Sequence, residues 1–429
     1  MSTVVKEITR VDLQKTIWRI IMSEVKKVNY TKQADVDFDL RLAMEEATRC
    51  LLCEDAPCSQ GCPAGTNPAK FIRSIRFRNF KGAAETIREN NILGGSCALV
   101  CPYGNLCEEA CSRCGIDRPI QIGKLQKFAI NHEKETEMTI LKAGERIDKK
   151  VVCVGAGPAS LACAAKLEEN GVDVTIIEKF GKAGGVLTYG ITPSRLPQEV
   201  VDHDIKQVEK LGVDFKFNTE VKGNEGIKEL LKEYDAVFVG VGLWTASVPE
   251  IPGVDSKNVF TAQEFLKNAR VNNGNIELGN DILVIGGGDV AMDCASTAKQ
   301  LGAKNVAIVY RRTIEEAPVY HEELKYVQAM GVPIITRFAP DKIIADDNGC
   351  VEKMSFKSWD NVGEMTMKAD TVIFAIGQKA EESFKNIIKD EAVFVNGDIV
   401  NGGKTVVQAV ADGKESALEI LDYLNKEAK

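Results

Sequence analysis

The chain has 429 residues, of which 44% are hydrophobic and 27% charged, and its formal net charge is −8. This length allows two or three domains with cores of their own, and the composition is ordinary for a globular protein. The acidic balance argues against non-specific nucleic-acid binding, and no apolar run approaches the roughly 18–20 residues that span a bilayer. Residues 1–19 are mixed and charged, unlike a signal peptide, so we expect a cytoplasmic protein with neither a nucleic-acid nor a membrane partner.

Residues 1–148 are predicted to form a small helical domain. They contain few β-branched runs, and the stretches 40–52 and 68–90 have apolar residues at helical spacing among many charges. Eight of the 13 cysteines fall here in two runs, with the spacings C-x2-C-x4-C-x3-C-P and C-x3-C-P-x4-C-x3-C. The first run is Cys50, Cys53, Cys58 and Cys62, and the second is Cys97, Cys101, Cys107 and Cys111.

Cysteines at these spacings are typical ligands of iron in two [4Fe–4S] clusters. A pair of zinc sites is the alternative, since thiolates in clusters also hold structural zinc. The chain has only 3 histidines, and they are far apart, so a histidine-based metal site is not expected.

A dinucleotide-binding domain is predicted to begin at residue 149. A strand at 151–154, a helix at 159–170 and a strand at 172–178 make a β-α-β unit. Gly155-Ala-Gly157-Pro-Ala-Ser160 joins the first strand to the helix. In this motif the first glycine permits the tight turn, the second lets the backbone approach a pyrophosphate, and the third position must be small. Glu178 ends the second strand, where a carboxylate accepts hydrogen bonds from the ribose of FAD or NAD.

A second β-α-β unit is predicted from a strand at 282–285, a helix at 289–301 and a strand at 305–310. Its phosphate-binding motif is Gly286-Gly-Gly288-Asp289-Val-Ala291.

The second strand of this unit ends in Arg311 and Arg312, where the first unit has an acid. Two guanidinium groups suit a 2′-phosphate through bidentate bonds, so NADPH is favoured over NADH at this site. Glu315 and Glu316 follow closely and leave NADH open.

Two similar strands, 235–242 and 371–377, end in glycines and bracket the second unit. This pattern indicates one nucleotide-binding domain inserted into another. We predict an FAD-binding domain at 149–247 and 373–429, with an NAD(P)H-binding domain at 248–372. The predicted fold is therefore α/β with a helical N-terminal domain: an all-helical iron–sulfur domain followed by two nested Rossmann-like dinucleotide-binding domains.

This combination predicts an oxidoreductase that takes a hydride from NAD(P)H onto FAD and passes single electrons through two clusters to a second protein. Zinc is redox-inactive, so zinc sites could not accept those electrons or pass them on. Hydride transfer needs no protein acid or base, so no catalytic side chain is predicted.

The segment from Cys50 to Pro63 resembles the N-terminal cluster region of dihydropyrimidine dehydrogenase. Similar stretches recur along nearly the whole chain, and a more distant similarity is to the small subunit of glutamate synthase. The stretches are Phe71-Ile-Arg-Ser-Ile, Pro119-Ile-Gln-Ile-Gly-Lys-Leu-Gln126, Gly184-Gly-Val-Leu-Thr, Arg195-Leu-Pro-Gln-Glu-Val-Val and Gly397-Asp398-Ile-Val-Asn-Gly-Gly-Lys-Thr405.

The resemblance implies ligand sets that draw on both cysteine runs. One cluster would use Cys50, Cys53, Cys58 and Cys111, and the other Cys62, Cys101, Cys107 and the side chain of Gln126. Cys97 would then be a non-ligand. Chains like the glutamate synthase subunit tend to carry a glutamate at position 126, so the glutamine favours the pyrimidine branch.

The resemblance also implies flavin contacts. Glu178 would bind the ribose, and Gly185, Leu187 and Arg195 would approach the cofactor. Asp398 would hold the ribityl or pyrophosphate region, and Thr405 would begin a helix near the isoalloxazine. The stretch 377–397 is shorter than is usual in the family.

The implied partner is a catalytic subunit with FMN, further iron–sulfur clusters and a barrel like that of dihydroorotate dehydrogenase. It would reduce uracil or thymine at the 5,6 bond in a hetero-oligomer. A glutamate synthase small subunit, or a module of a similar multi-subunit oxidoreductase, is the second hypothesis. A zinc-bearing scaffold with empty nucleotide folds is the third.

Overall fold

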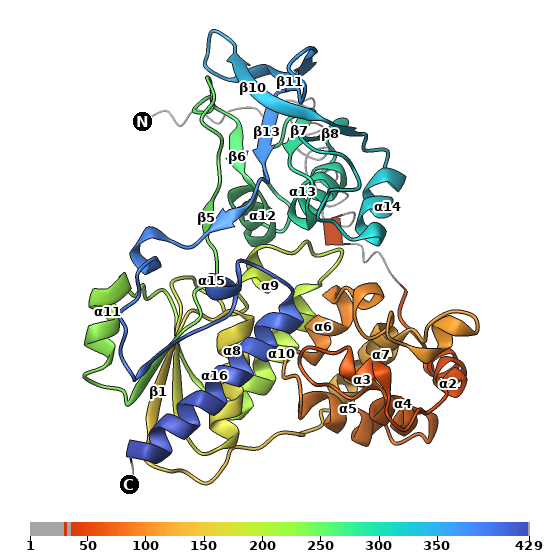
Figure 1. Ribbon diagram of the computed structural model, residues 1–429, viewed down its shortest axis with the longest axis vertical. Helices are drawn as coiled ribbons and strands as arrows, with labels where there is room; N and C mark the ends of the chain where they lie inside the picture. Colours follow the sequence, from red (N-terminus) through yellow and green to blue (C-terminus); the bar gives the residue numbers. More distant parts are fainter. Residues whose placement is uncertain (1–29, 32–35, 428–429) are drawn as a thin grey trace, which may run out of the picture. The chain divides into compact units, whose positions relative to one another are not determined.

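The computed structural model describes residues 30–31 and 36–427 of the chain (Figure 1). These residues divide into two compact units: one comprises 246–377 with 30–31 and 192–194, and the other comprises 36–191, 195–245 and 378–427. Among the described residues, no helix combines the length and the apolar character that crossing a bilayer requires. The expectation for residues 1–19 lies outside the described residues.

Three of the helices between residues 40 and 135 begin at side-chain caps. Asp39, Asn67 and Asn79 each accept a hydrogen bond from a backbone N–H in the first turn, at 2.7, 2.9 and 3.0 Å. The stretch 68–90, predicted as helical, is two helices, because the chain turns at Arg78 with a φ of 58°. The helices are α2 (Leu40–Arg49), α3 (Pro57–Gln60), α4 (Pro68–Arg76), α5 (Phe80–Arg88), α6 (Gly94–Val100), η1 (Tyr103–Asn105), η2 (Ser112–Gly115) and α7 (Ile122–Glu135).

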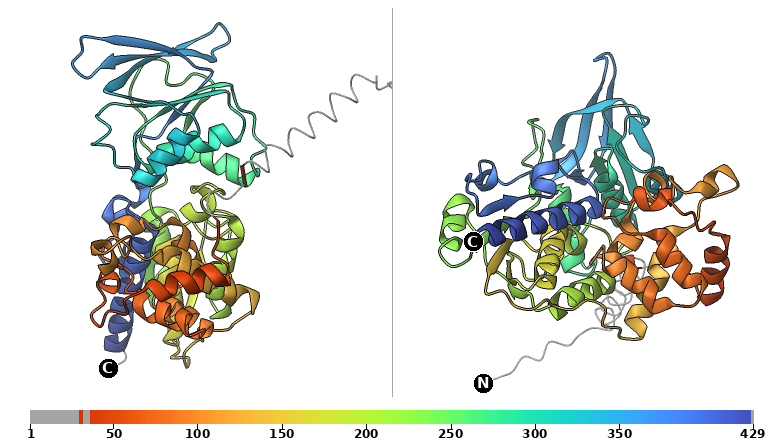
Figure 2. Two further views of the ribbon diagram at one scale, coloured as in Figure 1. Left: turned by 90° about the vertical axis from the view of Figure 1, so that its right-hand side faces the viewer. Right: turned by 60° about the horizontal axis from the view of Figure 1, so that its bottom comes forward.

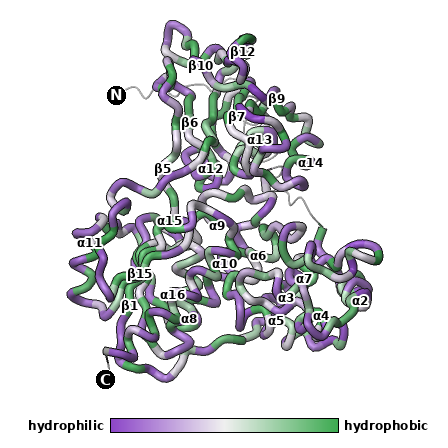
Figure 3. Tube along the Cα trace, in the orientation of Figure 1, coloured by the Kyte–Doolittle hydropathy of each residue, from purple (hydrophilic) through white to green (hydrophobic). Residues whose placement is uncertain are grey.

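The flavin-type fold, in the same compact unit as these helices, is a five-stranded parallel sheet in the order β15-β4-β1-β2-β3. Its central strands are mostly apolar and buried, and Figure 3 shows the hydrophobic residues in the region of β1. Helix α16 lies along α8 on one face of the sheet (Figures 1 and 2). The elements are β1 (Lys150–Val154), α8 (Pro158–Glu169), β2 (Asp173–Ile177), α9 (Val186–Tyr189), α10 (Gln198–Lys210), β3 (Asp214–Lys216), α11 (Gly223–Leu230), β4 (Ala236–Val239), η3 (Glu382–Phe384), β15 (Val393–Val395), α15 (Asp398–Asn401) and α16 (Val406–Glu427).

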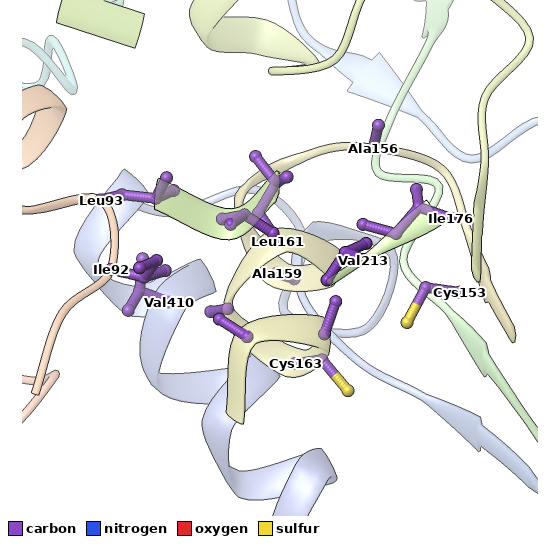
Figure 4. Packing of buried hydrophobic residues seen from close by; sticks show 14 of the residues in the cluster. Ile92, Leu93, Cys153, Ala156, Ala159, Leu161, Cys163, Ile176, Val213 and Val410 are labelled. Atoms are coloured by element: carbon purple, nitrogen blue, oxygen red, sulfur yellow. The ribbon is translucent and has the colours of Figure 1, made fainter. Parts of the chain in front are cut away.

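The core of this fold extends into the helical part of the unit. Ile92 and Leu93, which precede α6, belong to the same buried cluster as Leu161 of α8 and Val410 of α16. Figure 4 shows Ile92 beside Val410. The cysteine-bearing helices and the flavin-type fold therefore share one continuous core.

The 246–377 unit has a second five-stranded parallel sheet, in the order β6-β13-β7-β8-β9. Its helices cover one face, and a three-stranded antiparallel sheet, β10-β11-β12, packs on the other. The elements are β6 (Val259–Thr261), α12 (Ala262–Val271), β7 (Asp281–Ile285), α13 (Asp289–Gln300), β8 (Asn305–Tyr310), α14 (His321–Ala329), β9 (Ile334–Thr336), β10 (Phe338–Ala345), β11 (Val351–Ser358), β12 (Glu364–Lys368) and β13 (Thr371–Phe374).

The predicted fold class is confirmed: a helical domain precedes two nested Rossmann-like folds. The chain leaves the flavin-type fold at β5 (Thr245–Ala246) and returns at β14 (Gln378–Lys379), and these two strands pair. The inserted compact unit thus spans 246–377, against the predicted 248–372.

The N-terminal boundary differs from the predicted domain 1–148. The ring of Tyr30 is fully buried in the core of the 246–377 unit, with residues of α12 and α13. Gly274 permits this, because a Cβ there would stand 2.9 Å from the Tyr30 ring. The segment that contains Tyr30 belongs to the nucleotide-binding unit rather than to the helical domain.

Candidate cofactor sites

Four of the predicted cluster ligands line one cavity in the helical part. Cys50 lies at the end of α2, Cys58 in α3 and Cys111 directly before η2, and Cys53 follows the turn made by Leu52 at a φ of 54°. The cavity measures about 340 Å³ including its opening to solvent, and its other walls are mostly apolar. They are formed by Leu51, Ala56, Pro57, Ala69, Ile72, Ser112, Arg113, Ile120 and Ile122.

Electrostatics at this cavity suit a positively charged occupant. Burial, together with negative charge on Cys111 and Cys50, raises the pKa of the Cys58 thiol to about 11. Burial likewise raises the pKa of Cys50. Thiolates gathered in an apolar cavity are unfavourable unless a metal compensates their charge, and metal binding releases their protons.

The thiols of Cys50, Cys53, Cys58 and Cys111 lie in the wall of the cavity. Within residues 30–31 and 36–427, no three His, Cys, Asp or Glu side chains converge closely enough to hold a single metal ion. Four cysteines that line one cavity suit an iron–sulfide cluster, whose thiolate ligands bind separate irons.

The remaining cysteines form a second group on and around α6. The thiol of Cys101 interacts by hydrogen bonding with that of Cys97, and this contact and burial raise the pKa of Cys101. Cys107 and Cys62 also act on Cys101 electrostatically, and Cys62 and Cys58 act on Cys107. The structure thus brings Cys97 to the same place as the three thiols that were predicted as ligands.

Gln126 lies on the face of α7 that packs against α6. It is 9% exposed, and its Nε2 donates to the carbonyl of Gly94 at 2.7 Å, which leaves Oε1 as the atom with lone pairs for a metal. One turn earlier, Gly123 accommodates the ring of Tyr103, because a Cβ there would stand 2.3 Å from it. The Tyr103 hydroxyl donates to the carbonyl of Cys97 at 2.8 Å. Sequence reasoning did not identify Tyr103 or the need for Gly123, which only the packing of the two helices explains.

The first glycine motif forms an open cradle at the start of α8. Gly155 has a φ of 90°, and a Cβ there would stand 3.0 Å from the carbonyl oxygen of Gly240 at the end of β4. At Gly157 the nearest atom to a Cβ would be 3.9 Å away, so space remains above the backbone at the helix N-terminus. The Oγ of Ser160 is fully buried without a hydrogen-bond partner. These features fit the pyrophosphate of a dinucleotide.

Glu178 closes this cradle from the end of β2. Its carboxylate accepts hydrogen bonds from the backbone N–H of Ala156 and of Phe180, each at 2.8 Å. Burial raises the pKa of Glu178, and these two donors oppose the shift. Each carboxylate oxygen has a second lone pair, so the side chain can still accept from a ribose hydroxyl.

Of the other residues implied as flavin contacts, Gly185 lies at the same helix start. A Cβ on Gly185 would stand 2.9 Å from the Cα of Gly157, so this glycine packs on the phosphate loop. Leu187 is fully buried in the core beneath it, and Arg195 is half-buried.

The C-terminal segment reaches α8 as well. A Cβ on Gly397 would stand 2.9 Å from that of Ala159, which brings the next residue, Asp398, to the start of α8. Burial raises the pKa of Asp398, whose carboxylate accepts from the backbone N–H of Lys404 at 3.4 Å. Thr405 Oγ1 accepts from Gln408 N at 3.2 Å and begins α16, as predicted.

The second glycine motif stands at the start of α13 in the 246–377 unit. A Cβ on Gly286 would stand 2.2 Å from the carbonyl of Ala375, and one on Gly288 would meet its nearest neighbour, in Pro318, at 3.6 Å. Asp289 Oδ1 accepts from Tyr320 N at 3.2 Å, which ties the 313–320 loop to the helix start. Ala291 is fully buried, as the third position of the motif requires.

Arg311 and Arg312 lie exposed just beyond the end of β8. Glu316 is held by the backbone N–H of Thr313 at 3.0 Å, and this bond, the Thr313 side chain and the charge of Arg312 lower its pKa. Among the described residues neither arginine has a carboxylate within 4.0 Å. Both guanidinium groups therefore remain available to an anionic group.

Comparisons with known proteins agree with this division. Residues 26–138 match the family described as dihydropyrimidine dehydrogenase domain II, 4Fe-4S cluster, and residues 149–413 match the pyridine nucleotide-disulphide oxidoreductases. The chain is 47% identical over 410 residues to the NAD-dependent dihydropyrimidine dehydrogenase subunit PreT of Escherichia coli K12, covering 92% of this chain and 98% of that protein. It is 30% identical to the glutamate synthase [NADPH] small chain of the same organism, covering 94% and 95%.

Solved structures share the fold. FprA from Mycobacterium tuberculosis in complex with NADPH aligns with a TM-score of 0.55 at 18% identity, over 65% of this chain and 86% of that chain. The thioredoxin reductase of Lactococcus lactis aligns with a TM-score of 0.52 at 19% identity, over 65% and 100%. The resemblance predicted from the sequence is confirmed, and so are the predicted [4Fe–4S], flavin and nicotinamide cofactors.

Proposed function

Because the chain belongs to the family of NAD-dependent dihydropyrimidine dehydrogenase PreT subunits, we propose that it supplies electrons to a partner that reduces uracil or thymine to the 5,6-dihydropyrimidine. The chain itself is an NAD(P)H-dependent oxidoreductase subunit with [4Fe–4S], flavin and nicotinamide sites. When bound, these groups supply hydride transfer followed by single-electron transfer.

The observation that carries this proposal is the sharing of one core between the flavin-type fold and the second cysteine group. Cys62 and Cys101 pack against the buried cluster of that fold. Cys50, Cys58, Cys107 and Cys111 pack instead against the core of the helical part. The second group therefore lies between the flavin-type fold and the cavity of the first group, which opens to solvent.

The chain's own residues bind the cofactors and orient them. The backbone at Gly157 and the start of α8 receive the pyrophosphate, and Glu178 receives the ribose. The thiols of the two groups, with Gln126, hold the clusters as the family resemblance implies. Thiols and an amide oxygen are suitable ligands for iron, and we assign them to two clusters. One cluster uses Cys50, Cys53, Cys58 and Cys111, and the other uses Cys62, Cys101, Cys107 and Gln126.

The proposed partner is a catalytic subunit with FMN, further iron–sulfur clusters and a barrel like that of dihydroorotate dehydrogenase, joined to this chain in a hetero-oligomer. The similar PreT proteins are themselves named as subunits, which supports an assembly with a second chain. All 13 cysteines lie in the described residues and none forms a disulfide there, which supports a cytoplasmic location for this complex.

The two arginines after β8 bear on whether the hydride donor is NADPH or NADH. Their available guanidinium groups favour NADPH, whereas the PreT relatives are named NAD-dependent. A lower KM for NADPH than for NADH would support a role of Arg311 and Arg312 in binding the 2′-phosphate.

The second candidate function is that of a glutamate synthase small chain, favoured by 30% identity over 94% of this chain. The higher identity to PreT and the glutamine at position 126 favour the pyrimidine branch.

The test is anaerobic co-purification with the candidate partner, followed by iron, sulfide and flavin analysis. We expect about eight irons and one FAD in this chain, and uracil-dependent oxidation of NADH or NADPH by the complex. Activity with an artificial electron acceptor, but none with any pyrimidine, would contradict the proposed substrate. Stoichiometric zinc in a colourless protein would contradict the whole assignment.

A further inference from the structure

Helix α6 has no N-terminal cap in its own sequence. Its N-cap residue, Leu93, makes no side-chain hydrogen bond to the first turn. Asp204 of α10, which belongs to the flavin-type fold, supplies the missing acceptor. Its Oδ2 accepts from Ser96 N and from Ser96 Oγ, both at 2.7 Å, and its Oδ1 accepts from Gly95 N at 3.2 Å. A carboxylate at this point satisfies free N–H groups and complements the helix dipole.

This contact is close and enclosed. Asp204 is 0% exposed, and a Cβ on Gly95 would stand 2.9 Å from its Oδ1, so only glycine allows the approach. Arg88 compensates the carboxylate through a bond of 2.6 Å from Nη1 to Oδ1. Burial disfavours the charge on Arg88, but Asp204 and Glu133 outweigh that effect and raise its pKa.

The helix capped in this way carries the second cysteine group. Cys97 lies inside α6, and Cys101 ends it. Gly94, the first residue of α6, accepts the hydrogen bond of Gln126. The position of α6 therefore fixes three of the side chains that surround the second cluster site.

A second side chain from the flavin-type fold, that of Lys414, holds the chain segments next to Cys62 and before α6. Lys414 of α16 donates from Nζ to the carbonyl of Ala64 and to that of Asn90, each at 2.7 Å. Ala64 follows Cys62 by two residues, and Asn90 precedes the turn into α6. Burial lowers the pKa of Lys414, and negative charge on Cys62 would favour its charged form.

We propose that Asp204 and Lys414 are positioning residues that fix the second cysteine group against the flavin-type fold and so set the rate at which electrons reach the cluster held there. This inference rests on the proposed electron-input function. The hydride donor would supply two electrons and one proton. The electrons would leave the flavin one at a time, each reducing one oxidised cluster, and the proton would pass to solvent. Small displacements of reacting groups lower rates steeply, so loosening α6 or the Cys62 loop slows this transfer.

Lys414 has a further effect through its charge. A half-buried cation whose charge acts on Cys62 favours the more negative, reduced form of a cluster bound there. Replacing Lys414 with methionine keeps most of the volume and removes the charge, and we expect the cluster's reduction potential to fall.

The experiment compares three variants of the full chain, Asp204→Asn, Ser96→Ala and Lys414→Met, with Glu168→Gln as the matched control. Glu168 is also a buried carboxylate of the flavin-type fold, but its partners are Arg146 and the N–H of Val174, away from the cysteines. Anaerobic stopped flow follows flavin reduction by NAD(P)H, and freeze-quenched EPR follows cluster reduction. Hydrogen exchange of the peptide 94–100 reports on the cap directly.

We expect flavin reduction to stay within about twofold of wild type in all variants, and cluster reduction to slow by about tenfold in Asp204→Asn and less in Ser96→Ala. Amide exchange in 94–100 should rise in both. In Lys414→Met the EPR-monitored redox titration should shift to lower potential. The control should match wild type in every measurement.

Wild-type rates of cluster reduction and unchanged exchange in Asp204→Asn and Ser96→Ala would overturn the positioning role. If Asp204→Asn does not fold, Ser96→Ala decides, since it removes one donor only. If wild-type protein binds neither iron nor flavin, the proposed function fails, while exchange in 94–100 still reports whether Asp204 caps α6. The two failures are therefore distinguishable.

Discussion

Loss of the Arg88 side chain should strongly destabilise the unit that contains the helical part and the flavin-type fold. Arg88 is 2% exposed, and its Nε and Nη2 donate to Glu133 at 3.0 and 2.8 Å. Its Nη1 donates to Asp204 at 2.6 Å and also to the carbonyl of Ile92. Methionine at position 88 would keep apolar volume but leave two buried carboxylates without their cation.

Breaking a buried ion pair from one side costs about 3–5 kcal/mol. Part of this cost is avoided here, because Asp204 keeps its bonds from Ser96 and Gly95, and Glu133 keeps His203 at 3.5 Å. We therefore expect Arg88→Met to lower the free energy of unfolding by about 3 kcal/mol. With a urea slope of about 3 kcal/mol/M, the denaturation midpoint should fall by about 1 M.

The assay is urea denaturation followed by circular dichroism, with Lys232→Met as the control, since Lys232 and Glu229 form an exposed pair. The double variant Arg88→Met/Glu133→Gln should recover part of the loss, because one unpaired buried charge is gone. A midpoint within 0.1 M of wild type for Arg88→Met would refute the reasoning that this guanidinium compensates buried carboxylates.

The pH dependence gives an independent check on the same network. Burial alone would raise the pKa of Glu133, but the nearby His203 and the charge and hydrogen bonds of Arg88 outweigh burial and lower it. A carboxyl whose folded pKa is depressed adds stability above its unfolded value, 4.5, and that stability is lost as pH falls through the folded value. Arg88→Met should flatten this acid-side loss.

Three further predictions concern the cofactor sites. Cys58→Ser should lose about half of the bound iron by chemical analysis, whereas Cys114→Ser, an exposed cysteine outside the cavity, should keep all of it; equal iron in both would exclude Cys58 as a ligand. Glu178→Gln should weaken FAD binding by about 1.5–3 kcal/mol, at least tenfold, because the amide has one acceptor oxygen where the carboxylate has two. Flavin fluorescence on dilution measures this loss. Unchanged retention of FAD would argue against a ribose contact. The double variant Arg311→Gln/Arg312→Gln should raise the KM for NADPH about tenfold or more and leave that for NADH within about twofold, and an equal effect on both would assign the arginines a role other than 2′-phosphate recognition.

The two nucleotide folds and the helical domain followed from local signals in the chain. A short apolar strand, a glycine turn and a helix of known length define a β-α-β unit, because each step depends on neighbouring residues only. Gly155 and Gly286 take positive φ at the turns where the motif requires it. The acid at 178 and the arginines after β8 were likewise readable from their offset to the motif.

Grouping of the cysteines depended on more than their spacing. Consecutive order would pair Cys62 with the first run, but the fold brings Cys111 into the cavity with Cys50 and leaves Cys62 beside Cys101. The packing of α7 against α6 and α4 decides this, and no local pattern encodes it. Resemblance to a known family, rather than spacing, predicted that Cys111 joins the first run and Cys62 the second.

The sequence by itself determined the secondary structure around each glycine motif and the kind of cofactor each site suits, because turns, caps and apolar periodicity act over a few residues. Tertiary structure alone decided that Asp204 caps a helix more than one hundred residues earlier in the chain, that Lys414 holds the loop after Cys62, and that Tyr30 is buried in the nucleotide-binding unit. These contacts join residues distant in the sequence, and they form only because burial of apolar faces brings the elements together before the polar groups are paired.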